Sequence, residues 1–175
     1  MDWYQTIFEV IDMRSFSNLW FWIALAVIWS TASHWVLGVP YDMVLRARRH
    51  GEQAQVDLED MVRINVNRIL YIAQVSGLWI LGFSCFFLTM LLILAVFYSF
   101  QFAQAVLLLA APLSIVTVLS LSTAQQIREE SATGDLLYKR LTRHRIYTQI
   151  IGMVSIFITS MWGMYQNLYV GPFGG

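Results

Sequence analysis

The stretch ILYIAQVSGLWILGFSCFFLTMLLILAVFYS, residues 69–99, decides the fold. It contains no Asp, Glu, Lys or Arg, and it is longer than the roughly 20 helical residues that cross a hydrocarbon core of about 30 Å. Backbone that faces lipid must satisfy its own hydrogen bonds, so this continuous apolar run predicts a transmembrane helix. Phe100 and Gln101 leave only a short link to the next apolar run, which pins the outer ends of the two helices together. The excess length is therefore expected on the cytoplasmic side, where residues 69–75 extend a helix that begins near Val56.

Three further runs, residues 19–39, 102–122 and 146–165, also lack acidic and basic side chains. With 58% hydrophobic and 13% charged residues, the whole chain has the composition of a membrane protein. The sequence thus predicts an all-α fold, a four-helix transmembrane bundle with helical cytoplasmic loops and a short N-terminal interfacial helix. The predicted division is a surface segment 1–18, a membrane domain 19–165 with spans near 19–39, 76–98, 102–122 and 146–165 and cytoplasmic loops 40–75 and 123–145, and a tail 166–175.

The distribution of positive charge predicts the orientation. All eleven Lys and Arg residues except Arg14 fall in the loops 40–75 and 123–145. Positive side chains near helix ends tend to stay in the cytoplasm, so both termini are expected to face the periplasm from a bacterial inner membrane.

Two surfaces are candidates for docking to a partner. Residues 1–18 place apolar side chains at helical spacing and acids on other faces, which predicts an amphipathic helix on the periplasmic surface. In the first cytoplasmic loop, two short helices are expected to fold back on each other across Gly51, either as a docking surface or as a solvated hairpin. Glu59 precedes Arg63 by four residues, the spacing of an exposed ion pair. The predicted docking residues are Trp3, Phe8, Glu9, Asp57, Glu59 and Arg63.

Positive charge also accumulates just before the fourth span. Such clusters attract anionic lipid head groups, at about 1 kcal/mol per charge near the surface. The predicted head-group residues are Lys139, Arg140, Arg143 and Arg145. Within the span itself, Ser155, Thr159 and Gly163 lie four residues apart, and small residues at this spacing predict a seam of close helix packing.

The sequence STASHW, residues 30–35, places His34 in an otherwise apolar run. An imidazole in lipid needs a partner and is a candidate functional group. One hypothesis makes His34 the axial ligand of a bacteriochlorophyll or a haem, because a neutral ring nitrogen binds magnesium or iron. The other is an interhelical hydrogen bond, which is far commoner in small bundles. Its candidate partners are Ser30, Gln74, Ser76 and Gln149.

No sequence pattern predicts an enzyme. The four apolar runs hold no charged residue for a proton or ion path, and the chain lacks the common hydrolase, phosphate-binding and metalloenzyme motifs. His50 and His144 lie beside arginines and are expected to be solvated, while a single cysteine, Cys85, cannot build a cluster. We expect no catalytic residue, no metal site and no required cofactor. Nucleic acid is not an expected partner, because the basic residues border the membrane and the net charge is zero.

Three stretches resemble a family of small alphaproteobacterial inner-membrane proteins, some of which are labelled as a component associated with the Suf iron–sulfur assembly complex. They are VIDMRSFSNLWFWI (residues 10–23), SHWVLGVPYDMV (33–44) and DLEDMVRINVNRILYIAQ (57–74). The label implies a role connected with iron–sulfur cluster assembly. The resemblance also implies a bacterial host from a lineage rich in photosynthetic and respiratory supercomplexes. It assigns no catalytic residue.

These observations favour a non-enzymatic accessory or structural subunit of a larger inner-membrane complex, with photosynthetic or respiratory electron transport as the expected setting. The expected partners are membrane lipids and the other integral-membrane subunits. Two alternatives stay open. One is a pigment- or haem-binding membrane protein with His34 as axial ligand, and the other is an assembly factor for such a complex.

Overall fold

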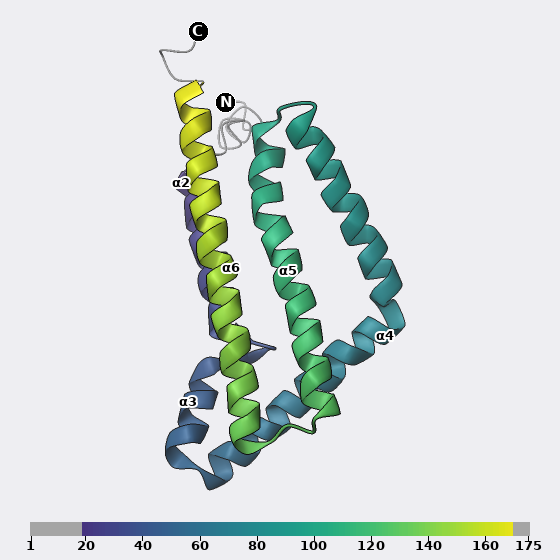
Figure 1. Ribbon diagram of the computed structural model, residues 1–175, viewed down its shortest axis with the longest axis vertical. Coiled ribbons are helices and arrows are strands. Elements are labelled where there is room, and N and C mark those ends of the chain that lie inside the picture. The colour runs from purple at the N-terminus through teal and green to yellow at the C-terminus, as the bar shows by residue number, and fades with distance from the viewer. Residues whose placement is uncertain (1–18, 170–175) are drawn as a thin grey trace, which may run out of the picture.

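The computed structural model describes residues 19–169, which form five helices and one small hairpin (Figure 1). The helices are α2 (Leu19–His34), α3 (Tyr41–His50), α4 (Glu52–Val96), α5 (Gln101–Glu129) and α6 (Gly134–Tyr169). The hairpin pairs β1 (Trp35–Val36) with β2 (Val39–Pro40). The fold is all-α as predicted, but the count of four helices is wrong for the described residues, because the first loop contributes the separate helix α3.

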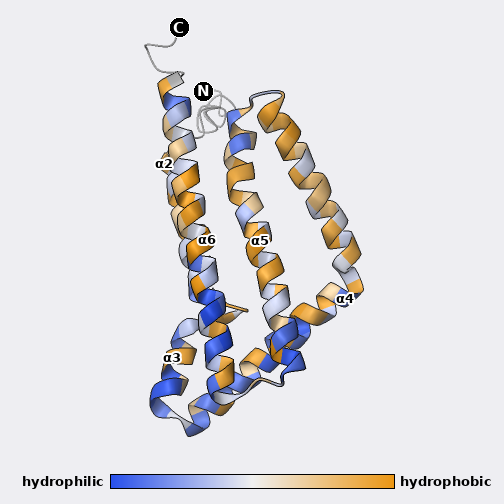
Figure 2. Cartoon of the chain, in the orientation of Figure 1, coloured by the Kyte–Doolittle hydropathy of each residue, from blue (hydrophilic) through white to orange (hydrophobic). Residues whose placement is uncertain are grey.

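Three of the described helices, α4, α5 and α6, are long and apolar enough to cross a membrane, and the chain is a membrane protein. At 16 residues, α2 is a shorter apolar helix. Most side chains in the apolar part of α4 are exposed and most of those in the apolar part of α5 are partly exposed, as expected for surfaces that contact lipid. Hydrophilic residues gather instead at one end of the molecule, around α3 and the beginnings of α4 and α6 (Figure 2).

The long helices alternate in direction through the molecule (Figure 1). Helix α2 packs against α6, α6 packs against α5, and α5 packs against α4. The beginning of α2 and the end of α6 consequently lie toward the same end of the structure. The first part of α4 runs obliquely across the opposite end, beneath α5 and α6, before the helix changes direction (Figure 1).

The predicted first span, residues 19–39, is too long. Its helix ends at His34, and Leu37 and Gly38 turn the chain back with φ angles of 52° and 76°. Glycine adopts this left-handed conformation without steric cost, and Pro40 has no N–H with which to continue a helix. Val36 and Val39 are 1% and 0% exposed. Their apolar character therefore reflects burial within the protein and not contact with lipid.

Residues 40–75, predicted as the first cytoplasmic loop, contain α3 and the first part of α4, which fold back on each other as expected. Gly51 separates them with a φ of 57°, and its N–H closes α3 on the Ala47 carbonyl at 3.0 Å. Helix α4 then continues without a break through residues 69–75 into the apolar run, which confirms the predicted extension. It begins at Glu52, four positions before the predicted Val56.

The largest buried core lies at the hydrophilic end. It joins the hairpin, α3, the first part of α4, the end of α5 and the beginning of α6. Leu58 on α4 and Leu141 on α6 are both 0% exposed within it. The predicted loop 123–145 is mostly helical, because α5 continues to Glu129 and α6 begins at Gly134, and it contributes six residues to this core: Ala124, Ile127, Ala132, Leu137, Tyr138 and Leu141.

The predicted packing seam on α6 is confirmed. Thr159 is 0% exposed, Ser155 is 5% exposed and Gly163 is buried. Ser155 also donates a long hydrogen bond of 3.4 Å to the Leu108 carbonyl of α5. One turn before Ser155, Gly152 approaches α2 so closely that a Cβ atom there would lie 2.8 Å from the ring of Trp29.

Candidate functional site

His34 lies at the last position of α2, and its side chain is exposed. Its ring meets the neighbouring Trp35 ring edge-on, with 6.0 Å between the centroids. None of the predicted interhelical hydrogen bonds to His34 forms within the described residues. Gln149, one of the candidate partners, donates instead to the Ser33 hydroxyl at 3.2 Å. The polar contact between α2 and α6 thus exists, but it uses the residue before the histidine.

The buried histidine of this chain is His144, which was expected to be solvated. Only 3% of it is exposed, because α6 already begins at Gly134 and turns this residue inward against α5. Its Nε2 atom lies 3.0 Å from the Ser120 hydroxyl, while its Nδ1 atom makes no hydrogen bond within the described residues. The sequence did hold a signal, since the buried residues Leu137, Leu141, His144 and Thr148 recur at helical spacing.

The contact between Ser120 and His144 does not form a nucleophile and a base. The Ser120 hydroxyl donates to the Val116 carbonyl at 2.8 Å, so its single proton is already used. It therefore accepts a hydrogen bond from Nε2–H of His144, which leaves Nδ1 as the unprotonated nitrogen. A serine activated for attack would need the reverse arrangement, with the hydroxyl donating to the imidazole.

The predicted docking residues in the first part of α4 divide into two kinds. Glu59 makes a contact within the protein: its carboxylate accepts a hydrogen bond from the Gly134 N–H at 2.9 Å and so joins the beginning of α6 to α4. It does not pair with Arg63 as its spacing suggested. Arg63 pairs with Asp60 at 2.8 Å, and both side chains are more than half exposed. Asp57 is exposed as well and accepts a hydrogen bond from Gln53. Trp3, Phe8 and Glu9 lie outside the described residues.

Exposed apolar side chains follow the side of α4 that faces away from the core. Leu58, Val62 and Leu70 are buried, and the exposed apolar residues between Met61 and Val75 form what we call the outer α4 face. Its members are Met61, Ile64, Tyr71, Ile72 and Val75, of which Ile64 is 61% and Tyr71 66% exposed. All five precede the predicted span 76–98.

A cleft of about 480 Å³ opens between the first part of α4 and the turn that joins α5 to α6. Its lining includes both signs of charge, from Glu59, Asp60, Arg63 and Arg128, together with buried apolar residues such as Val62. Such a mixture of an apolar floor and a charged rim is the composition of many protein interfaces.

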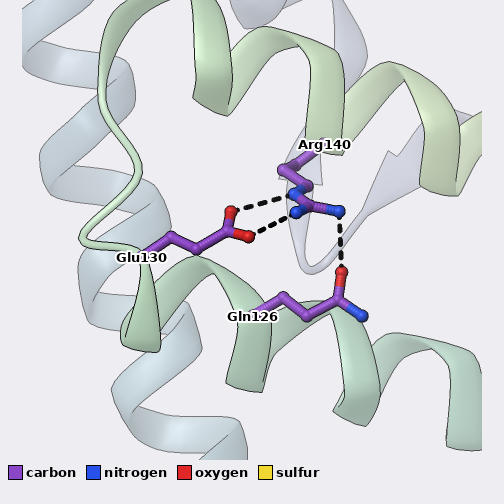
Figure 3. A network of polar contacts seen from close by, with 3 residues as sticks. All are labelled: Gln126, Glu130 and Arg140. Carbon is purple, nitrogen blue, oxygen red and sulfur yellow. Dashed lines mark hydrogen bonds and ion pairs between the residues drawn. The ribbon is translucent and has the colours of Figure 1, made fainter.

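The predicted basic cluster is also divided by the structure. Arg140 holds the turn between α5 and α6, where its guanidinium grips the Glu130 carboxylate through two nitrogens and donates to the Gln126 side chain at 2.9 Å (Figure 3). Lys139 is exposed, and Arg143 lies near the ring of Tyr147. The Arg145 guanidinium stacks on the Tyr41 ring of α3, with Cζ 3.9 Å from the ring centroid.

Beside Arg145, a second arginine joins α3 to α6. Arg48 donates to the Thr142 hydroxyl at 3.2 Å, and its Cζ atom lies 5.3 Å from the ring centroid of Tyr138. The Tyr41 hydroxyl meets the same Thr142 hydroxyl at 3.2 Å. We call Tyr41, Arg48, Tyr138, Thr142 and Arg145 the α3–α6 arginine site. Arg48 was not among the predicted site residues, because it lies more than ninety positions from Thr142 and about ninety from Tyr138 in the sequence.

No group of three or more His, Cys, Asp or Glu side chains in the described part of the chain is placed to hold a metal ion. Comparisons with known proteins found no matching family model, no matching curated protein and no matching solved structure.

Proposed function

We propose that this chain is a non-enzymatic accessory or structural subunit of a larger bacterial inner-membrane complex, and that the outer α4 face is its contact surface. Photosynthetic or respiratory electron transport is the proposed setting. That setting rests on the resemblance of three sequence stretches to alphaproteobacterial inner-membrane proteins, and the charge distribution of the loops supports a cytoplasmic position for the outer α4 face.

The observation that carries the proposal is the exposure of this apolar face outside the predicted span. A lipid-facing surface explains exposed apolar residues in the apolar part of α4, but Ile64 lies among charged residues such as Asp60, Arg63 and Arg68. The inward face of the same segment packs on α3, α5 and the hairpin, so the outward face points away from the core. An exposed apolar stripe rimmed by charges is a feature of surfaces that bind other proteins.

The cleft beside the outer α4 face gives the proposed contact surface a concave part. Arg63 lines the cleft and is an exposed residue near Ile64, so the two features are continuous. The hydrogen bond from the Gly134 N–H to Glu59 joins the beginning of α6 to α4 beside the cleft, which limits the movement of this part of the surface before a partner arrives. Preorganisation of this kind lowers the entropic cost of association.

The test is extraction of the tagged protein from its host in mild detergent, followed by mass spectrometry of what accompanies it. The double variant Ile64→Asn with Tyr71→Asn is expected to insert and fold normally but to lose most of the co-purifying subunits. A matched control is Leu45→Asn with Leu136→Asn, which changes two other exposed apolar residues at the hydrophilic end, 40% and 43% exposed. The control is expected to retain its partners. Recovery of the unmodified protein only as a free monomer would refute the proposal.

A further inference from the structure

The α3–α6 arginine site holds two cations in place without a carboxylate. Among the residues that the structure describes, the ion pairs are Arg63 with Asp60 and Arg140 with Glu130, and neither involves Arg48 or Arg145. Both guanidinium groups are instead positioned by tyrosine rings. Stacking of this kind stabilises a cation at the face of the ring and leaves the N–H groups in the guanidinium plane free to donate.

The hydrogen-bond donors of this site are only partly used. Arg48 donates to Thr142, but the Nε atom of Arg145 is buried and makes no hydrogen bond within the described residues. Burial, followed by the charges of Glu59 and Asp135, raises the pKa of the Tyr138 hydroxyl, so two acids lie near this site. Glu59 already accepts hydrogen bonds from the Gly134 N–H and the Gln55 side chain, and neither acid forms an ion pair with Arg48 or Arg145 within the described residues. A buried donor without an acceptor costs free energy, so an acceptor brought by a ligand is favoured.

The position of the site along the chain matches the depth of lipid head groups. Arg145 immediately precedes the apolar run 146–165, and Tyr41 follows the buried hairpin that ends α2. Tyrosine and arginine are typical of this interfacial layer, where the phosphates of the inner leaflet lie. Three more exposed arginines add positive potential around the site: Arg46, Arg49 and Arg143.

We propose that the α3–α6 arginine site binds the phosphate of an anionic phospholipid, with the guanidinium groups of Arg48 and Arg145 as its donors. The phosphodiester oxygens accept hydrogen bonds from both groups, and the acyl chains lie along the apolar surface of α6. Guanidinium groups suit this ligand because they can donate two parallel hydrogen bonds to one phosphate. The site is thus more specific than the general attraction of a basic loop for a negative membrane.

The experiment is native mass spectrometry of the purified full chain in detergent, titrated with phosphatidylglycerol and, separately, with phosphatidylcholine. The unmodified protein is expected to retain phosphatidylglycerol in preference. Arg48→Gln with Arg145→Gln is expected to weaken phosphatidylglycerol binding by about a hundredfold or more, because two charge-assisted hydrogen bonds to the phosphate are lost. The control, Arg46→Gln with Arg49→Gln, removes the same charge from exposed positions of α3 and is expected to lose much less.

Three outcomes would overturn the proposal. The first is equal weakening by the two pairs of substitutions, because that result indicates only a diffuse charge effect. The second is undiminished binding by Arg48→Lys with Arg145→Lys, which keeps the charge and removes the guanidinium fork; this variant also serves if the glutamine pair does not fold. The third is displacement of the lipid by millimolar inorganic phosphate, since that would assign the site to a free phosphate.

Discussion

The contact between Gly152 and Trp29 makes a sharp prediction about stability. A Cβ atom on Gly152 would lie 2.8 Å from Cε3 and 3.2 Å from Cδ2 of the Trp29 ring. The indole is 5% exposed, so it has no open space into which to retreat. For Gly152→Ala, helices α2 and α6 must separate by roughly half an ångström, and overpacking of a tight contact costs about 1–3 kcal/mol. We expect the free energy of unfolding to fall by that amount.

Gly82→Ala is the matched control. Gly82 is also within a long apolar helix, but nothing lies within 4 Å of the position that its Cβ would take. Alanine stabilises a helix interior by about 0.5–1 kcal/mol relative to glycine, so this variant is expected to unfold at an unchanged or higher temperature. Thermal unfolding in detergent, followed by circular dichroism, measures both variants. Equal stability of Gly152→Ala and Gly82→Ala would refute the close packing of α2 on α6, whereas recovery of stability by adding Trp29→Leu to Gly152→Ala would support it.

Two further substitutions test the sites. Glu59→Gln removes the charged acceptor of the Gly134 N–H and is expected to lower the melting temperature. Arg63→Gln is expected to leave the melting temperature nearly unchanged, because the Arg63 side chain is 70% exposed and a surface ion pair contributes about 0–1 kcal/mol. Equal effects of the two substitutions would argue against a stabilising contact between Glu59 and the beginning of α6. His34→Leu is expected to leave membrane insertion and the co-purifying subunits intact, because the exposed imidazole makes no hydrogen bond with a described residue. A visible absorbance band that disappears in His34→Leu would instead make this residue an axial ligand and contradict the proposed function.

The long apolar helices could be predicted because lipid imposes a strict demand on the backbone. Residues 69–99 and 146–165 contain no charged side chain; α4 covers the first run as far as Val96, and α6 covers the second run completely. The hairpin at Leu37 and Gly38 was not predicted, because its apolar residues look the same in sequence as the end of a transmembrane helix. Composition cannot distinguish an apolar segment that contacts lipid from one that is buried in protein, and the turn residues were the only local signal.

The sites were harder to predict, because each joins residues that lie far apart in the sequence. Glu59 has an arginine four positions away, but its carboxylate binds the Gly134 backbone, which no local spacing indicates. His144 is surrounded by arginines in the sequence, yet one face of α6 carries it into the core. Arg140 and Arg145 resemble each other in sequence context. Only the structure shows that one is neutralised by Glu130 and the other is not.

The core at the hydrophilic end has a consequence for the order in which the molecule is assembled. It combines Val36 and Leu58 with Leu141, so its parts leave the ribosome at widely separated times. At a translation rate of about 5–20 residues per second, Val36 precedes Leu141 by roughly 5–20 s. During that interval the hairpin, α3 and the first part of α4 have no α6 to cover them. Closure of this core therefore cannot precede synthesis of the beginning of α6, and the earlier helices have time to insert into the bilayer before it.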